Sequence, residues 1–272
     1  AAGAKLEDNT DGSGITGTVV KEYAAQIGEI GYDSLQEAVE NAKADDVITL
    51  LQNVEITSTI TIPADVTLTA EEGVTVTAST SGHSFSLSNG SKLDRLTIEL
   101  PDLGQSTTPV NIVYMTTGST VQNCEFTGGY TLATSDGETS RGIEVASSAT
   151  SIVITKNTFT NLRQPAYIND SCTGTISGNH VDGTRGWVVC GSSNMMFTGN
   201  TFGQNAVDIA IISSTTPGNN YADQLTQISE NNDGALVEDQ LQGAGNIHVQ
   251  DGVLLAGTEQ ELRDALAAAQ PG

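Results

Sequence analysis

Three arginines recur along this chain at one constant spacing. They are Arg141, Arg163 and Arg185, where 163 − 141 = 22 and 185 − 163 = 22. The chain holds only 10 Lys and Arg in 272 residues, so three in register indicate a structural period. Guanidinium groups at one position of successive repeat units would form a cationic line. Such a line needs interleaved carboxylates or an anionic ligand.

Two aromatic residues, Tyr167 and Trp187, lie close to these arginines in the sequence. A ring beside guanidinium groups suits a sugar, because C–H faces stack on the ring while hydroxyls take hydrogen bonds. We therefore predict a ligand site formed by Arg141, Arg163, Tyr167, Arg185 and Trp187. The alternative is that Trp187 packs inside and that the arginines pair with carboxylates, namely Glu138, Glu144, Asp182 or Asp208.

A repeated motif shows which elements must position these residues. Ile154-Thr-Lys-Asn157-Thr-Phe159 returns as Ile176-Ser-Gly-Asn179-His-Val181 and as Phe197-Thr-Gly-Asn200-Thr-Phe202, where 176 − 154 = 22 and 197 − 176 = 21. Weaker copies surround Cys124 and Asn231. Short β-favouring runs at this period, separated by Asn/Gly turns, predict the stacked coils of a parallel β-solenoid.

The repeated asparagine has a physical role in such a coil. Asparagine tolerates the left-handed backbone of a sharp bend, and its amide can bond to the same residue one coil away. We therefore expect Asn157, Asn179 and Asn200 to occupy one turn. The apolar residue three positions before each asparagine should then lie in one core row, formed by Ile154, Ile176 and Phe197.

This pattern resembles the right-handed parallel β-helix of pectin-lyase-like proteins, clearly over 119–233 and more broadly over 47–252. The resemblance implies an all-β fold, a single-stranded right-handed parallel β-helix. Capping boxes at Ser34-Leu-Gln-Glu37 and Thr258-Glu-Gln-Glu261 add an N-terminal capping helix and a C-terminal helix. The order of elements at the start looks like the opening of β-helix modules in large bacterial surface proteins.

Four segments follow from this assignment. Residues 1–26 are a polar N-terminal arm, and 27–46 form a short hairpin and a capping helix opened by the capping box Ser34-Leu-Gln-Glu37. Residues 47–252 form the parallel β-helix. Residues 253–272 form a helix that either caps the far end or begins a further module. Insertions at 128–139 and 213–223 are expected to be surface loops.

Composition narrows the possible partners and location. The net charge of −23 excludes nucleic acid and anionic membranes as preferred partners, and no apolar run is long enough to span a bilayer. Cys124, Cys172 and Cys190 fall at different phases of the repeat, which predicts buried thiols rather than disulfides between coils. Richness in Ser, Thr, Gly and Asn with few Lys favours an extracellular or cell-surface location.

Enzyme motifs of the resembling families match poorly. The sequence lacks the polygalacturonase set of Asn-Thr-Asp, Asp-Asp, Gly-His-Gly and Arg-Ile-Lys on neighbouring coils. Pectate lyases carry Arg-x-Pro-x-x-Arg with calcium-binding carboxylates, whereas this chain has Arg163-Gln-Pro165-Ala-Tyr-Ile168 and lacks the second Arg. Arg163 is therefore the candidate base only if the protein is a lyase. No metal ligands are predicted, and calcium is the one cofactor left open.

These observations predict a non-enzymatic extracellular module of the surface or adhesion type that binds glycans on one lateral face. One alternative is a polysaccharide lyase or hydrolase. The other is a structural subunit of a fibre, coat or virion appendage, with neighbouring protein subunits as partners.

Overall fold

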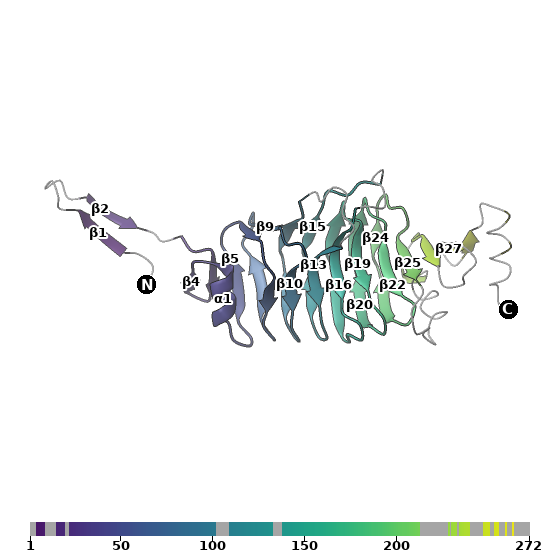
Figure 1. Ribbon diagram of the computed structural model, residues 1–272, viewed down its shortest axis with the longest axis horizontal. Helices are drawn as coiled ribbons and strands as arrows, with labels where there is room; N and C mark the ends of the chain where they lie inside the picture. The colour runs from purple at the N-terminus through teal and green to yellow at the C-terminus, as the bar shows by residue number, and fades with distance from the viewer. Residues whose placement is uncertain are drawn as a thin grey trace.

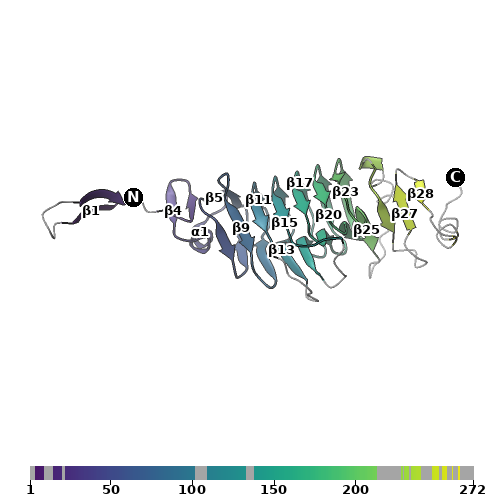
Figure 2. The same cartoon turned by 90° about the horizontal axis from the view of Figure 1, so that it is seen from above.

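The computed structural model describes residues 4–8, 15–19, 22–101, 109–132 and 138–212, followed by short stretches at 228, 230–232, 234–239, 247–250, 253–255, 259 and 263. The molecule is an elongated stack of coils (Figure 1). Seen from above, successive coils follow one another along the long axis from α1 to β25 (Figure 2). Each coil contributes one strand to each of three sheets, so residues one coil apart in sequence become neighbours.

The three sheets run along the stack. The ten-stranded sheet contains β7 (Ile60–Ile62), β10 (His83–Leu87), β13 (Val110–Met115), β16 (Ser140–Val145), β19 (Gln164–Ile168), β22 (Trp187–Cys190), β25 (Ile209–Ile212), β26 (Val237–Asp239), β27 (Ile247–Gln250) and β28 (Val253–Leu255). The nine-stranded sheet contains β4 (Ile30–Tyr32), β3 (Ala25–Ile27), β5 (Val47–Leu50), β8 (Thr67–Ala70), β11 (Lys92–Asp94), β14 (Thr120–Gln122), β17 (Ile152–Thr155), β20 (Thr173–Ser177) and β23 (Asn194–Thr198). The seven-stranded sheet contains β6 (Val54–Ile56), β9 (Thr75–Ala78), β12 (Thr97–Glu99), β15 (Glu125–Thr127), β18 (Thr158–Thr160), β21 (His180–Asp182) and β24 (Thr201–Phe202).

The predicted core row is confirmed by the strand register. Ile154 of β17 is opposite Ile176 of β20, which is opposite Phe197 of β23, and all three side chains are fully buried. Parallel pairing places equivalent residues about 4.8 Å apart along the axis, so their side chains stack on one another. The apolar residues of each coil thus form a continuous core through the solenoid.

Ile176→Ala is expected to lower the free energy of unfolding by about 2–5 kcal/mol, because the rows above and below hold the cavity open. Chemical denaturation monitored by circular dichroism measures this change. A loss below about 0.5 kcal/mol, the usual size for a surface substitution, would contradict the burial of this side chain.

The predicted asparagine ladder is also present, and it ends one residue later than expected. Asn157, Asn179 and Asn200 are at most 2% exposed, and each Nδ2 donates to the Oδ1 of the next asparagine at 2.8–3.0 Å. The last member is Asn232 rather than Asn231. Its Nδ2 donates to the Ile228 carbonyl at 2.8 Å, a four-residue separation that places Asn232 in the turn.

The left-handed residue of this turn precedes the ladder asparagine. Its φ is 54° at Asn123, 56° at Lys156, 63° at Gly178 and 62° at Gly199. The expectation that the ladder asparagine itself adopts this conformation is therefore wrong. Its role lies in the side-chain amide, which replaces the backbone hydrogen bonds that the bend removes.

The expected N-terminal cap is confirmed. Strands β3 and β4 form an antiparallel hairpin, and α1 (Leu35–Asn41) follows it. The helix begins at Ser34, whose Oγ accepts from the Glu37 backbone N–H at 3.1 Å. Leu35, Ala38 and Val39 are buried against the first coil. The helix thereby covers an end where sheet edges would otherwise be open to other chains.

Both ends differ from the predicted boundaries. Ala25 and Gln26, assigned to the arm, pair with Leu50 and Thr49 in the nine-stranded sheet, so the arm ends before β3. Within the rest of the arm, β1 (Ala4–Asp8) and β2 (Ile15–Val19) form an antiparallel hairpin. At the far end, β27 and β28 are antiparallel, because the connection between Asp239 and Ile247 is too short to carry the chain around another coil.

The prediction of a helix over 253–272 is wrong at its start, because Val253–Leu255 forms strand β28. Its remainder lies outside the described residues apart from Glu259 and Arg263, which form an ion pair with 2.6 Å between Arg263 Nη2 and Glu259 Oε1. Besides α1, the described residues 228, 230–231, 259 and 263 are helical. No helix among the described residues is long and apolar enough to cross a membrane.

Candidate functional site

Arg141 lies in the ten-stranded sheet, whereas Arg163 and Arg185 precede two of its strands and are in register with each other. The backbone N–H of Arg185 donates to the Arg163 carbonyl at 2.8 Å, just before strands β22 and β19. Arg141 lies instead within β16, opposite Gln164. Ser140 takes the place next to Arg163, since its Oγ accepts from the Arg163 N–H at 2.9 Å. The constant spacing of 22 thus aligns Arg163 with Arg185 and leaves Arg141 one position away.

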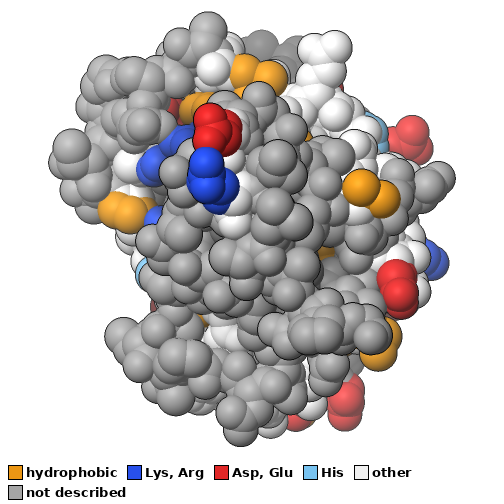
Figure 3. Space-filling view, turned by 90° about the vertical axis from the view of Figure 1, so that its right-hand side faces the viewer, with side chains coloured by type: hydrophobic (Ala, Val, Ile, Leu, Met, Phe, Trp, Pro, Cys, Tyr) orange, Lys and Arg blue, Asp and Glu red, His pale blue; other side chains and the backbone are white. Residues whose placement is uncertain are grey.

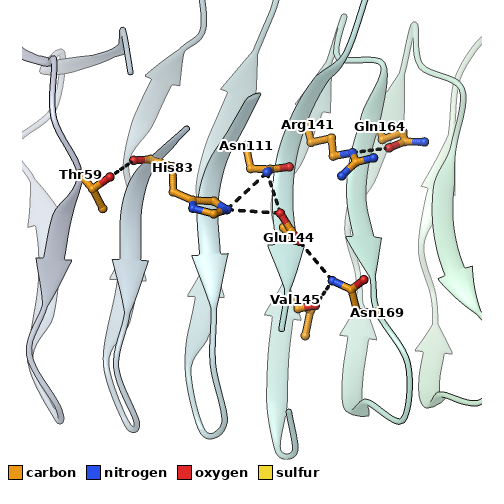
Figure 4. A network of polar contacts seen from close by, with 8 residues as sticks. All are labelled: Thr59, His83, Asn111, Arg141, Glu144, Val145, Gln164 and Asn169. Carbon is orange, nitrogen blue, oxygen red and sulfur yellow. Dashed lines mark hydrogen bonds and ion pairs between the residues drawn. The ribbon is translucent and has the colours of Figure 1, made fainter. Parts of the chain in front are cut away.

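Arg141 supports the neighbouring Tyr167. Its guanidinium carbon lies 4.3 Å from the centroid of the Tyr167 ring, and its Nε donates to Gln164 Oε1 at 2.8 Å, a contact drawn in Figure 4. Burial lowers the pKa of Arg141, with Glu144 opposing this shift, but an arginine remains charged at any physiological pH. One face of the Tyr167 ring is therefore occupied by a fixed cation, so a ligand can approach only the remainder of the ring.

A cleft of about 370 Å³ opens beside Tyr167. Its described lining combines two arginines, one carboxylate, two other polar side chains and five apolar side chains: Arg163, Arg185, Glu238, Gln164, Tyr167, Val188, Ala206, Val207, Ala210 and Ile212. The cleft therefore brings together three of the five predicted ligand-binding residues, namely Arg163, Tyr167 and Arg185.

The polar groups of the cleft favour an anionic ligand. Within the described residues, Arg163 is not ion-paired with a carboxylate, and its Nε is buried without a hydrogen-bond acceptor. The Nε itself is enclosed by protein, but the Arg163 guanidinium lines the cleft without a carboxylate partner in the described part of the chain, so its charge is available to an anionic ligand. Burial raises the pKa of Tyr167, so its hydroxyl stays protonated at neutral pH.

Trp187 lies in the core and is not part of the predicted ligand site. Its side chain is fully buried, and its ring lies 5.3 Å from the Phe159 ring centroid and 6.0 Å from that of Phe197, both in edge-on geometry. The indole therefore belongs to the aromatic core between the sheets and cannot stack on a sugar outside. The alternative interpretation, in which Trp187 packs inside, is the correct one.

A second polar cluster on the same sheet was missed by sequence reasoning. His83 Nε2 lies 3.3 Å from Glu144 Oε2, and Asn111 Nδ2 donates to the same oxygen at 2.7 Å (Figure 4). Asn169 Nδ2 lies 3.3 Å from Glu144 Oε1 and also donates to the Val145 carbonyl at 2.8 Å. These contacts hold the Glu144 carboxylate in one orientation, so it presents fixed acceptors next to Arg141.

The sequence did contain a signal for this cluster. Phe85, Val113 and Ile143 lie in one buried row, and a polar residue precedes each of them by two positions. Those polar residues are His83, Asn111 and Arg141, which pair in register across β10, β13 and β16. Aligning the irregular coils by their apolar residues would have revealed the row.

The described residues contain no group of three or more His, Cys, Asp and Glu side chains that could hold a metal ion. All three cysteines are free and buried, as the repeat phases predicted. Burial raises the pKa of Cys124 to about 12 and that of Cys190 to about 11, so both are thiols rather than nucleophilic thiolates at neutral pH.

Comparison with known proteins agrees with the fold. A search among curated proteins and among solved structures found no match. A family model described as "Right handed beta helix region" matches residues 51–226, which is more than half of the chain. The three stacked parallel sheets are the structure that this description implies. The chain therefore belongs to the right-handed β-helix family.

Proposed function

We propose that this protein is a non-enzymatic extracellular module of the surface or adhesion type that binds an acidic glycan on the outer face of its ten-stranded sheet. The observation that supports this most is the pair Arg163 and Arg185 in a cleft on a body of net charge −23. A carboxylate takes directional, charge-assisted hydrogen bonds from guanidinium groups.

The same cleft gives little support to catalysis. General acid–base chemistry needs titratable groups within hydrogen-bond reach of the substrate. The described lining has one carboxylate, Glu238, and no histidine. If the protein is instead a lyase with Arg163 as base, it should release unsaturated sugars from a uronate polymer. An absorbance assay of that product, with and without calcium, distinguishes turnover from binding.

The arginine pair provides the direct test of binding. Each charge-assisted hydrogen bond contributes about 1.5–3 kcal/mol, so Arg163→Gln/Arg185→Gln is expected to weaken oligogalacturonate binding at least about 100-fold. Binding by the unaltered protein should also weaken as salt is raised, because the cleft is open to solvent. Isothermal titration calorimetry measures both effects, and it is preferable to Trp187 fluorescence because the indole is buried.

Arg95→Gln/Arg263→Gln is the matched control. These arginines are 67% and 68% exposed and neither lines the cleft, so this variant also removes two positive charges. Oligogalacturonate affinity should stay close to that of the unaltered protein. Equal weakening in the control and in the arginine pair would show that only overall charge matters, and it would remove the site.

A structural subunit of a fibre, coat or appendage is a second candidate. The observation that favours it is the β1–β2 hairpin, which extends beyond α1 at the N-terminal end of the stack (Figure 1). A two-stranded hairpin is marginally stable in water, so a neighbouring subunit would stabilise it. Electron microscopy of the purified protein distinguishes filaments from single particles.

A further inference from the structure

The floor of the cleft is apolar where a solvated sheet face would be polar. Tyr167, Val188 and Ala210 are paired in register on β19, β22 and β25, in the outward-facing row that also contains Glu144. Val188 and Ala210 are nonetheless only 6% exposed. Outward-facing residues with so little exposure lie at the bottom of a concavity. A ligand that enters the cleft therefore meets apolar surface there.

Side chains of opposite charge surround this apolar floor. Arg163 and Arg185 lie just before β19 and β22, and both line the cleft, where they supply cationic donors. Glu238 continues the row one coil beyond Ala210 and supplies a carboxylate acceptor. Tyr167 to Glu238 spans three coil steps, or about 14 Å. The cleft thus offers an anion-binding side, an apolar middle and an acceptor end.

We infer that the cleft selects acidic sugar residues that carry an acetyl group over acidic sugars that lack one. The carboxylate of such a residue would bind Arg163 and Arg185, while the acetyl methyl would cover Val188 and Ala210. A hydroxyl or amide N–H of the sugar would donate to Glu238. This inference rests on the proposed glycan binding and narrows it to one class of ligand.

An unsubstituted uronate fits these surroundings less well. Its hydroxyls would lie against Val188 and Ala210, and a hydroxyl buried without a partner costs free energy. The volume agrees with a short ligand, because 370 Å³ is at the lower end of the range of about 300–1,000 Å³ for ligand pockets. We therefore expect recognition of one or two sugar residues rather than of a long chain segment.

Calorimetry with two matched probes tests this inference. The probes are O-acetylated oligogalacturonate and the same material after mild alkaline deacetylation, with oligomeric N-acetylglucosamine as a neutral acetylated control. The acetylated acid should bind about tenfold more tightly than its deacetylated form, since one methyl-sized group in an apolar pocket gives roughly this discrimination. The neutral control should bind most weakly, because it has no carboxylate for the arginines.

Two variants assign the preference to the floor. Val188→Thr and Ala210→Ser each add a hydroxyl at little change in size, and each should reduce the ratio between the acetylated and deacetylated affinities toward one. Equal affinity of the unaltered protein for both probes would overturn the acetyl preference while leaving glycan binding intact. Binding of neither probe would overturn both. A preference that persists in both variants would also overturn the assignment to this floor.

Discussion

Asn179→Ala is expected to lower the free energy of unfolding by about 3–5 kcal/mol. The Asn179 Oδ1 accepts from both the backbone N–H and the Nδ2 of Asn157, at 2.9 and 3.0 Å. Its Nδ2 donates to the Ile154 carbonyl at 3.0 Å and to Asn200 Oδ1 at 2.9 Å. Alanine would leave several buried groups without partners, at about 1–3 kcal/mol each. Such a loss is large for a single substitution.

Chemical denaturation of the variant beside Thr198→Ala measures this effect. Thr198 is exposed at the end of β23, close to the same turn, so its truncation should change stability by no more than about 0.5 kcal/mol. If both substitutions lowered the free energy of unfolding by the same small amount, the asparagine ladder would contribute little to the stability of the fold.

Trp187→Ala should be comparably destabilising, by about 3–5 kcal/mol, because it removes the largest fully buried side chain of the core. The Phe159 and Phe197 rings would then face a cavity. Trp187→Phe should cost much less. Phenylalanine fills most of the volume, and it removes an indole N–H that is buried without an acceptor in the described structure.

The same two variants separate a core role from a ligand role. Because the indole does not line the cleft, Trp187→Phe should bind oligogalacturonate with nearly the affinity of the unaltered protein. A large loss of affinity in a variant that remains folded by circular dichroism would place Trp187 in the site after all.

The core row and the asparagine ladder were predicted correctly because both follow from the repeat of 21 or 22 residues. A spacing of 21 or 22 residues fixes which apolar residue stacks on which, so the row of Ile154, Ile176 and Phe197 follows directly. The ladder follows for the same reason. It shifts at Asn232, where 232 − 200 = 32 includes an insertion whose length alone does not reveal the register.

The orientation of Trp187 depends on a bend that spacing does not reveal. Arg185 and Trp187 are two residues apart, so within one strand they would face the same side. Gly186 lies between them with φ 81°, however, and β22 begins only at Trp187. The chain turns at Gly186, which leaves Arg185 at the cleft and directs Trp187 into the core.

The His83 cluster escaped prediction because its coils are irregular. The spacings are 111 − 83 = 28 and 141 − 111 = 30, so no constant period links His83, Asn111 and Arg141. Their pairing comes from the strands on either side of variable turns. The cleft is similarly hidden, since Glu238 reaches it only through the pairing of β25 with β26.

The most direct test of the anion-binding cleft is a crystal structure of the protein with the acidic oligosaccharide that binds most tightly. We expect one sugar carboxylate within about 3 Å of guanidinium nitrogens of Arg163 and Arg185, with the sugar over Val188 and Ala210. An oligosaccharide bound at another face or at an end of the solenoid, with the cleft free of sugar, would contradict it.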